Sequence, residues 1–394
     1  MTKQRLGWGL VVAAGILFLA QLLPNLATPH RGKVAHVTAV VPGPLTSASP
    51  QSVTRFEAPS RGAMSWQLLV DRGGDGSSAD ILLASGTPGG RVRFGTALAG
   101  DRGRSQSPDG TIVAEGGRLT GRGTSADLSK FGDPSRTSSF TWSDDSDGVC
   151  GLEGDGTRAT YLVVFAFARG GLNPSLVGRF QLPADLSYAG ELGPSLLACG
   201  GTRGLAVIGL TDPAQRGRVI ELDMVSGAVR SRREFAAAPG GFVASPDGSL
   251  VASNGRTEKP AVPSTIIELR SGRVLLSLGG ERLVRAFSAD NGAVLVSPAV
   301  LGGASLLSLN GGESLWSDGS DRQLVGWQVE PGAGRMAVAL ATRRLDTCTK
   351  GEPGKFPEFC QLAPLQDLLV IPAVRGARPL NLGRGVGLFG YAVS

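Results

Sequence analysis

Histidine, the most frequent catalytic base in proteins, occurs only at His30 and His36 in this chain of 394 residues. Both lie in a proline-containing stretch near the N-terminus. The remaining residues therefore have no imidazole for a Ser-His-Asp or Cys-His triad or for a metal site. A Gly-x-Ser-x-Gly elbow and a P-loop are also missing from the sequence. We accordingly expect no catalytic residues, no bound metal and no cofactor.

Acidic side chains gather at two places where a cation could be considered. Asp144, Asp145 and Asp147 precede Gly148 and resemble half of a calcium-binding loop. Their spacing departs from the EF-hand pattern, and no Glu stands at its twelfth position. A second group lies in a Gly/Ser-rich stretch: Asp71, Asp75 and Asp80. We interpret both groups as solvated turn residues, with calcium as the alternative.

Two further motifs match ligand-binding patterns only in part. Residues 385–390 fit G-x-G-x-x-G, but four residues follow them, so no helix can supply the N-terminus that binds phosphate. We interpret this segment as the glycine-rich end of a strand. Residues 288–292 resemble the Asp-box of sialidases, except that Leu295 stands where the box has Trp. This motif keeps an enzyme acting on carbohydrate open as an alternative.

Arginine supplies most of the positive charge, with 33 Arg and six Lys contributing to a net charge of +6. One cluster stands out: Arg203, Arg216, Arg218, Arg230, Arg232 and Arg233. Such a cluster could meet acidic partners or anionic lipid headgroups, and it is our candidate interaction surface. The alternative is a solvated face. Nucleic acid is not expected as a partner, because aromatic residues are not interleaved with the arginines.

Four cysteines are compatible with an exported protein, and they allow three pairings. Cys348 and Cys360 bracket an insertion, so a disulfide closing that loop is predicted. Cys150 and Cys199 would then pair and join neighbouring units of the fold, with two free buried thiols as the alternative. No Cys-x-x-Cys occurs, which argues against redox catalysis and thiolate zinc sites.

A short turn phrase recurs along the chain and is followed each time by an apolar run. It reads Ser-Pro-Asp-Gly at 107–110 and at 245–248, and a variant, Ser-Ala-Asp-Asn-Gly, occupies 288–292. Further copies are expected near Ser143 and Glu330. Pro presets φ for a type I turn, Asp bonds back to the backbone, and Gly accepts the left-handed conformation. The apolar runs are too short for helices and predict strands buried on both faces.

A second phrase follows the first and completes a repeating unit. It is Ile-Glu-Leu and then Ser-Gly, at 220–227 and again at 267–272, which predicts a strand and a hairpin turn. Repeats of roughly 40 to 50 residues with such turns are typical of the four-stranded blades of a β-propeller. We predict an all-β fold with seven blades over 61–394, leaving six or eight as alternatives. Residues 386–393 would complete the first blade and close the ring.

These turn phrases resemble WD40-like propellers and, more closely, bacterial TolB-type repeats. The resemblance covers most of residues 100–380. It implies a role in the cell envelope through binding other proteins.

The N-terminus adds a membrane segment to this picture. Residues 1–5 carry Lys3 and Arg5, and an apolar run of membrane-spanning length follows at 6–23. The positive-inside rule places the N-terminus in the cytoplasm and the remainder outside. We favour an uncleaved anchor, with a cleaved signal peptide as the alternative. Residues 24–60 are rich in Pro, Ser and Thr and would form a spacer before the propeller at 61–394.

The sequence therefore predicts a membrane-anchored, extracytoplasmic propeller that binds a protein partner or scaffolds an envelope complex, and that is not an enzyme. The alternative is a propeller enzyme or a sensor that binds a small ligand or carbohydrate of the envelope. The sequence leaves the partner and any small-molecule ligand unidentified.

Overall fold

A computed structural model provides the structure of the chain. The chain divides between Ser60 and Arg61, and every residue described below belongs to the second unit, 61–394. The structure describes residues 66–71, 81–86, 93–98, 105–108, 112–115, 118–121, 124–127, 137–154, 159–167, 174–184, 194–212, 214, 216–236, 238–255, 262–279, 282–298, 302–319, 322–330, 334–344, 347 and 361–392.

The described strands form seven four-stranded sheets, which we number in chain order. Sheet 1 contains β28 (Gly387–Ala392), β1 (Trp66–Asp71), β2 (Ile81–Gly86) and β3 (Arg93–Leu98). Sheet 2 contains β4 (Ser105–Gln106), β5 (Ile112–Glu115), β6 (Arg118–Gly121) and β7 (Thr124–Asp127). Sheet 3 contains β8 (Thr137–Trp142), β9 (Gly148–Gly154), β10 (Ala159–Phe167) and β11 (Pro174–Gln181).

The remaining sheets follow the same order. Sheet 4 contains β12 (Ser195–Gly200), β13 (Leu205–Thr211), β14 (Gly217–Asp223) and β15 (Val229–Phe235), with the short 3₁₀ turn η4 (Gly201–Arg203) after β12. Sheet 5 contains β16 (Phe242–Ala244), β17 (Leu250–Ser253), β18 (Ser264–Glu268) and β19 (Val274–Leu278). Sheet 6 contains β20 (Arg282–Phe287), β21 (Ala293–Pro298), β22 (Ser305–Ser308) and β23 (Ser314–Ser317). Sheet 7 contains β24 (Arg322–Val329), β25 (Met336–Arg343), β26 (Leu362–Ile371) and β27 (Leu380–Gly385).

Each of sheets 2 to 7 is an antiparallel meander in which successive strands of the chain pair with one another. Sheet 1 differs, because the C-terminal β28 pairs antiparallel with β1, with Gln67 opposite Ala392. The predicted closing strand is therefore confirmed. It also accounts for the G-x-G-x-x-G match, since residues 385–390 run from the end of β27 into β28. Pairing the two ends of the repeat region covers the strand edge that each would otherwise expose.

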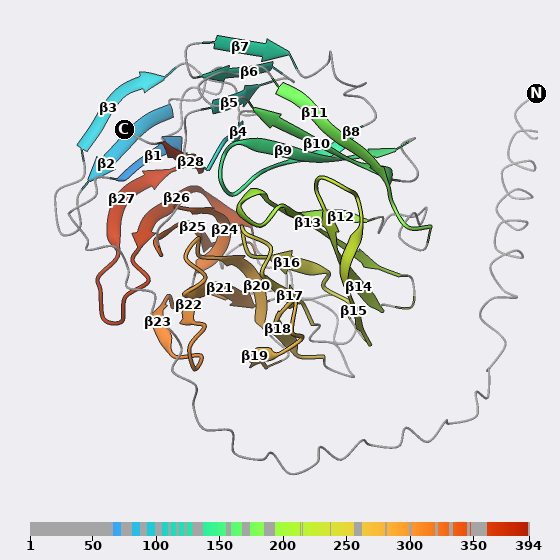
Figure 1. Cartoon of the computed structure of the whole chain (residues 1–394). Helices are drawn as coiled ribbons and strands as arrows, with labels where there is room; N and C mark the ends of the chain where they lie inside the picture. The colour runs from blue at the N-terminus through green and yellow to red at the C-terminus, as the bar shows by residue number, and fades with distance from the viewer. Residues whose placement is uncertain are drawn as a thin grey trace, which may run out of the picture. The chain divides into compact units, whose positions relative to one another are not determined.

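The first strands of the sheets contact one another in sequence order. β28 contacts β4, β8 contacts β12, β12 contacts β16, β16 contacts β20, β20 contacts β24, and β24 contacts β28. In Figure 1 β28, β4, β16, β20 and β24 lie towards the middle of the unit, while β3, β7, β19, β23 and β27 lie at its periphery. Repeated four-stranded meanders whose first strands lie inside and whose last strands lie outside are the architecture of a β-propeller.

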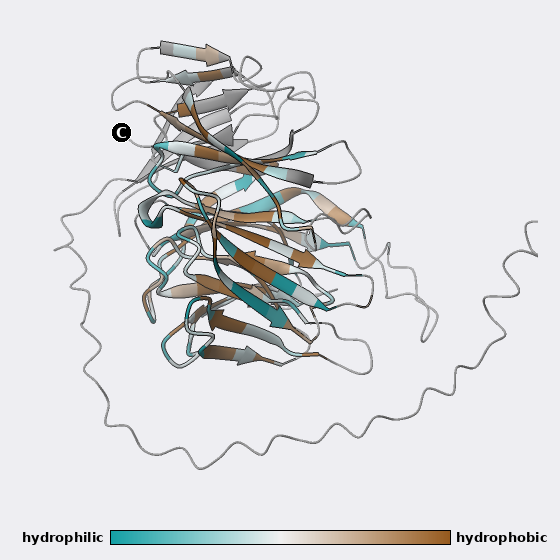
Figure 2. Ribbon diagram, turned by 45° about the vertical axis from the view of Figure 1, so that its right-hand side comes forward, coloured by the Kyte–Doolittle hydropathy of each residue, from teal (hydrophilic) through white to brown (hydrophobic). Residues whose placement is uncertain are grey.

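The hydrophobic core lies between consecutive sheets. All four residues of β17 are buried, as are the first five of β21, which is the two-sided burial expected for the apolar runs after the turns. One cluster joins Ile208 of sheet 4 to Leu162 of sheet 3, and another joins Leu306 of sheet 6 to Val338 of sheet 7. Figure 2 shows the sheets packed one on the next, with hydrophobic positions concentrated in the strands. The all-β fold and its repeated sheets are thus as predicted.

Several predictions concern residues outside the described part of the chain. These are the cytoplasmic tip at 1–5, the anchor at 6–23, the spacer at 24–60, and the bridge between Cys348 and Cys360. Among the residues that the structure does describe, no helix has the length and apolar character needed to cross a bilayer.

Candidate functional site

The recurring turn is held by its own serine and aspartate. In sheet 5 the buried Ser245 hydroxyl donates to Asp247 Oδ1 at 2.6 Å and accepts from the Leu250 amide at 2.9 Å. Asp247 Oδ1 also accepts from the Ser249 amide at 3.0 Å. Gly248 between them has φ of +71°, in the left-handed region that favours glycine. These local bonds connect β16 to β17 and place the turn at the inner end of the sheet.

The same arrangement recurs in sheets 6 and 3. Ser288 donates to Asp290 Oδ1 at 2.6 Å, and Ser143 donates to Asp145 Oδ1 at 2.5 Å. The residues equivalent to Gly248 are Asn291 and Ser146, with φ of +53° and +62°. The acidic group around Asp145 is therefore a copy of the turn, and its carboxylate bonds within that turn. Among the described residues, no group of three or more potential ligands is arranged to hold a metal ion.

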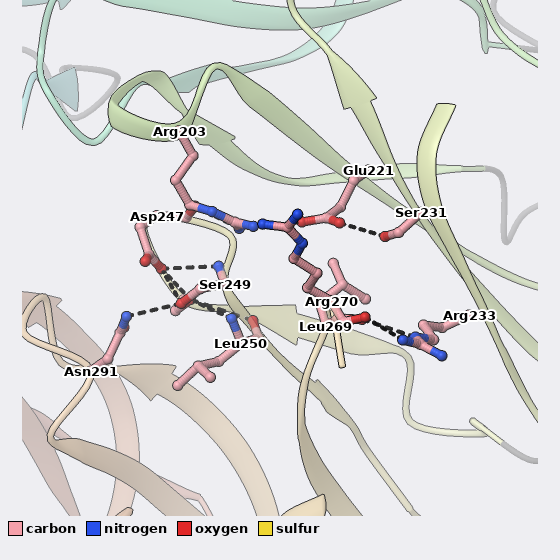
Figure 3. Close-up of polar contacts among 11 residues, drawn as sticks. Arg203, Glu221, Ser231, Arg233, Asp247, Ser249, Leu250, Leu269, Arg270 and Asn291 are labelled. Atoms are coloured by element: carbon pink, nitrogen blue, oxygen red, sulfur yellow. Dashed lines mark hydrogen bonds and ion pairs between the residues drawn. The ribbon is translucent and has the colours of Figure 1, made fainter. Parts of the chain in front are cut away.

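A buried ion pair ties the equivalent turn of sheet 4 to its own third strand. Arg203, at the end of η4, donates from Nη2 to Glu221 Oε1 at 2.9 Å. The Glu221 side chain is 2% exposed and that of Arg203 is 24% exposed. The other Glu221 oxygen accepts a hydrogen bond from Ser231 on β15. Glu221 thus connects three parts of sheet 4 (Figure 3).

The turns are also bonded from one sheet to the next. Arg203 Nη1 donates to the Asp247 carbonyl of sheet 5 at 3.4 Å, and Asn291 Nδ2 of sheet 6 donates to Ser249 Oγ at 3.1 Å (Figure 3). In the other direction, the Thr202 amide of sheet 4 donates to Asp144 Oδ1 of sheet 3 at 3.1 Å. Polar contacts therefore run through the inner turns of four consecutive sheets, 3 to 6, and we call them the turn network.

The electrostatics of the turn network agree with this arrangement. Burial of the Asp247 carboxyl opposes its ionisation, but hydrogen bonds from Ser245 and Ser249 outweigh burial, so the pKa of Asp247 lies below its ordinary value. The turn of sheet 7 is built differently. There Glu330 pairs with Arg335, and burial raises the pKa of Glu330 above its ordinary value although the guanidinium opposes the shift.

A second contact between sheets 5 and 6 lies at the other end of β17. The buried Asn254 accepts from the Val284 amide at 2.8 Å and donates to the Val284 carbonyl at 3.1 Å. The Asn254 side chain therefore pairs with both the N–H and the C=O of one residue of β20. A buried amide left without partners costs free energy. Moving the two sheets apart would break both bonds of Asn254, so the contact opposes any change in their spacing.

The predicted Arg cluster lies on sheet 4, and its members have different partners. Arg203 belongs to the turn network. Arg233 donates from Nε to the Leu269 carbonyl of sheet 5 at 2.9 Å and from Nη2 to the Arg270 carbonyl. The other four pair with carboxylates of the same sheet: Arg216 with Asp212, Arg218 and Arg232 with Glu234, and Arg230 with Asp223. The arginines therefore do not form one uniform basic face.

Disulfide geometry joins Cys150 of β9 to Cys199 of β12, with 5.7 Å between the Cα atoms. Both residues are completely buried. The bridge links sheets 3 and 4, the neighbouring units that the sequence prediction named. Of the two alternatives for this pair, the structure has the disulfide and not the free thiols.

The hairpins that join the third and fourth strands form a second repeated feature, which the sequence analysis did not identify as a site. In sheets 4, 5 and 6 the amides of Gly227, Gly272 and Gly312 donate to the carbonyls of Asp223, Glu268 and Ser308 at 2.8 to 3.0 Å. Because the same bond occurs in each hairpin, the residues of the three hairpins can be compared position by position. Two residues after each glycine stands the first residue of the outer strand: Val229, Val274 and Ser314.

Large apolar side chains are exposed on two of these hairpins. Val225 is 77% exposed at the tip of the sheet 4 hairpin, Val229 is 46% exposed, and Val274 of sheet 5 is 58% exposed. The Ser-Gly phrase at 226–227 and 271–272 located the hairpins in the sequence. Comparing the exposed valines of the two sheets required the alignment of the hairpins, and the bonds of Arg233 show that these hairpins belong to adjoining sheets.

No protein-family model and no curated protein matches this chain. Among solved structures, it is similar to TolB from Acinetobacter baumannii, with 12% identity, a TM-score of 0.36, and coverage of 83% of this chain and 66% of that one. It is also similar to a putative 6-phosphogluconolactonase from Bacteroides fragilis, with 10% identity, a TM-score of 0.44, and coverage of 83% and 97%. Hydrazine synthase from Kuenenia stuttgartiensis has 13% identity, a TM-score of 0.39, and coverage of 62% and 64%, so the match spans less than two thirds of that chain.

Proposed function

We propose that this protein is a membrane-anchored, extracytoplasmic β-propeller of seven blades that binds a protein partner in the cell envelope. Each blade corresponds to one of the seven described sheets. In this proposal the protein acts by binding or scaffolding and not by catalysis.

The observation that carries the proposal is the exposure of large apolar side chains on neighbouring hairpins. Val225 is 77% exposed and Val274 is 58% exposed, on the hairpins of sheets 4 and 5. Single exposed apolar residues are common on protein surfaces, and here they occur on two hairpins that Arg233 joins to each other, so one partner could contact both. Val225 stands at the tip of the sheet 4 hairpin and Val274 at the start of the outer strand of sheet 5, and both are exposed, so a partner can reach them without any movement of the core.

The frame behind these hairpins is well suited to a binding surface. The turn network joins sheets 3 to 6, and Arg233 joins the outer strand of sheet 4 to the hairpin of sheet 5. A surface that is already held in place loses little conformational entropy when a partner binds. The repeated sheets thus supply rigidity, and the hairpins supply the variable residues.

Two features support the proposed location. The apolar run at 6–23 has the length of a bilayer span and follows Lys3 and Arg5. The completely buried bridge between Cys150 and Cys199 suits an oxidising compartment, because disulfides persist outside the cytoplasm.

The test uses the full-length protein in native membranes. Membranes are treated with a chemical crosslinker, and the protein is isolated through a C-terminal affinity tag. We expect a specific protein partner to be recovered in amounts comparable to the bait, and alkylation before lysis to find Cys150 and Cys199 oxidised. Isolation of the protein without any partner, together with turnover of a small substrate, would contradict the proposal.

A further inference from the structure

We propose that the hairpins of sheets 4 and 5 form the docking surface and that they bind an acidic, extended segment of a protein partner which also carries apolar side chains. We call this surface the rim; it consists of residues 223–234 and 268–274. The inference rests on the proposed function and specifies where the partner binds and what its chemistry is.

The first argument comes from equivalent positions in three hairpins of the same geometry. The first residue of the outer strand is Val229 in sheet 4, Val274 in sheet 5 and Ser314 in sheet 6, and it pairs in register with Leu222, Ile267 and Leu307 in turn. At the hairpin tip the residues are Val225, Arg270 and Asn310. All six are exposed. Apolar and cationic residues therefore occupy these positions in sheets 4 and 5, while sheet 6 has polar uncharged ones.

The second argument is that the two hairpins are held together as one surface. Arg233 on β15 donates to the carbonyls of Leu269 and Arg270 in the neighbouring hairpin. A Cβ placed on Gly272 would lie 3.0 Å from Arg233 Cζ, so the guanidinium packs directly on that hairpin, where Gly272 has φ of +75°. The backbone carbonyls satisfy this cation, and no carboxylate is needed to hold it.

The third argument is charge. The rim contains five arginines, namely Arg230, Arg232, Arg233, Arg270 and Arg273, and three carboxylates, namely Asp223, Glu234 and Glu268. Two positive charges are therefore in excess. Among the described residues, no carboxylate lies within ion-pair distance of the exposed Arg270, and Arg273 is 3.5 Å from Glu268 with 69% of its side chain exposed. Exposed pairs of this kind contribute little free energy, so both cations can turn to a partner's carboxylates.

The geometry favours a peptide carboxylate over a lipid surface. Arg230 is fixed by two hydrogen bonds to Asp223 Oδ2 at 2.6 and 3.0 Å, and these bonds, with amides of the turn, hold the pKa of Asp223 well below its ordinary value. The charge of Arg230 is thus compensated within the rim, and the cations left for a partner are Arg270 and Arg273, whose planar guanidinium groups suit the bidentate recognition of carboxylates. Surfaces that lie on bilayers present aromatic or long apolar side chains beside the cations, whereas the rim presents valines.

The experiment is site-specific photocrosslinking of the full-length protein in native membranes. A benzophenone amino acid replaces Val274 in the rim, Ser314 at the equivalent position of sheet 6, or Leu176, which is 47% exposed on β11 of sheet 3. We expect a protein adduct from position 274 and little from position 314, and an adducted peptide rich in Asp or Glu with interspersed apolar residues. Arg270→Glu together with Arg273→Glu should lower the adduct yield at position 274 by about tenfold, because reversed rim charges repel an acidic partner.

The outcomes separate this inference from the proposed function. Protein adducts at position 176 or 314 but not at 274 would overturn the rim and leave protein binding intact. Absence of protein adducts at all three positions would count against both. A lipid adduct at position 274, or an adducted peptide without excess acid, would overturn the stated partner chemistry. Thermal unfolding of each variant shows whether a loss of adduct reflects a loss of fold.

Discussion

Arg203 and Glu221 form an ion pair of 2.9 Å in which the carboxylate is almost completely buried, and the same guanidinium reaches the Asp247 carbonyl of the next sheet. One side chain therefore bonds both within its own sheet and across to the neighbouring one. The relationship explains why an arginine lies at the inner turn of sheet 4, where the turns of sheets 3, 5 and 6 have a Ser bonded to an Asp.

Removing one member of this pair should cost more than removing both. Arg203→Met leaves a carboxylate buried without its cation, and we expect a loss of roughly 3 kcal/mol in the free energy of unfolding. The double variant Arg203→Met, Glu221→Met should cost less than the single one, because no uncompensated charge remains. Denaturant unfolding measures both. Arg216→Met is the control, since the Arg216 side chain is 70% exposed and the loss of its pair with Asp212 should cost less than about 1 kcal/mol. A double variant as unstable as the sum of the two singles would contradict this account.

Gly248 should tolerate a methyl group less well than Gly241, although the two have nearly the same backbone conformation. Their φ values are +71° and +72°, so alanine at either position costs about 1 kcal/mol of backbone strain. A Cβ at Gly248 would also lie 2.6 Å from Cγ2 of the completely buried Val207, whereas at Gly241 it would meet nothing within 4 Å. We therefore expect Gly248→Ala to lose a further 1 kcal/mol or more, about the lower end of the cost of overpacking. Equal melting temperatures for the two variants would show that the turn does not pack on β13 as described.

The Asp247 carboxylate predicts an acid dependence of stability with a defined sign. Its pKa in the folded protein lies below the ordinary value of 3.8, so the folded state favours the ionised form. The stability that this provides is complete above pH 5 and is lost as the pH falls through 3.8 towards the lower folded value. Unfolding free energies of the wild type and of Asp247→Asn should therefore differ by a constant amount above pH 5 and converge below pH 4. A difference that grows on acidification would reverse the assigned sign.

The bridge between sheets 3 and 4 should contribute substantially to stability. Cys150 and Cys199 are 49 residues apart in the sequence, and a cross-link of this span typically contributes about 2 to 4 kcal/mol. We expect the variant Cys150→Ala, Cys199→Ala to unfold at a correspondingly lower denaturant concentration than the oxidised wild type. Cys348 and Cys360 are present in both proteins, so the difference in stability between the two proteins reports on Cys150 and Cys199 alone. If the double variant were as stable as the oxidised wild type, the bridge would have no stabilising role.

Local features of this fold were predictable from the sequence, because their partners lie a few residues apart. The hydrogen bonds of Ser245 and Asp247 span at most five residues, and all of the groups involved lie in the turn phrase and the two residues after it. The same holds for the hairpin glycines Gly227 and Gly272, which bond to carbonyls four residues earlier. The closing strand was predictable because the two ends of a repeat array need to cover their edges.

The site depends on contacts that no local pattern encodes. The sequence predicts that Arg233 belongs to a basic surface, whereas in the structure its guanidinium donates to carbonyls 36 and 37 residues away in the next sheet. Ser249 and Asn291 likewise belong to different sheets. The exposure of Val229 and Val274 depends on strand register, which moves a residue between faces when it shifts by one position. These features required the packed structure.

The central claim is that the exposed valines of sheets 4 and 5 hold a protein partner, and it is tested most directly by the variant Val225→Ser, Val274→Ser in full-length protein. The control is Ser314→Ala in the equivalent hairpin of sheet 6. The measurement is the amount of partner recovered with each protein after crosslinking in native membranes, at equal bait. Our account predicts that the valine variant keeps its melting temperature and loses most of the partner, while the control keeps both. Equal recovery of the partner by the two variants would contradict it.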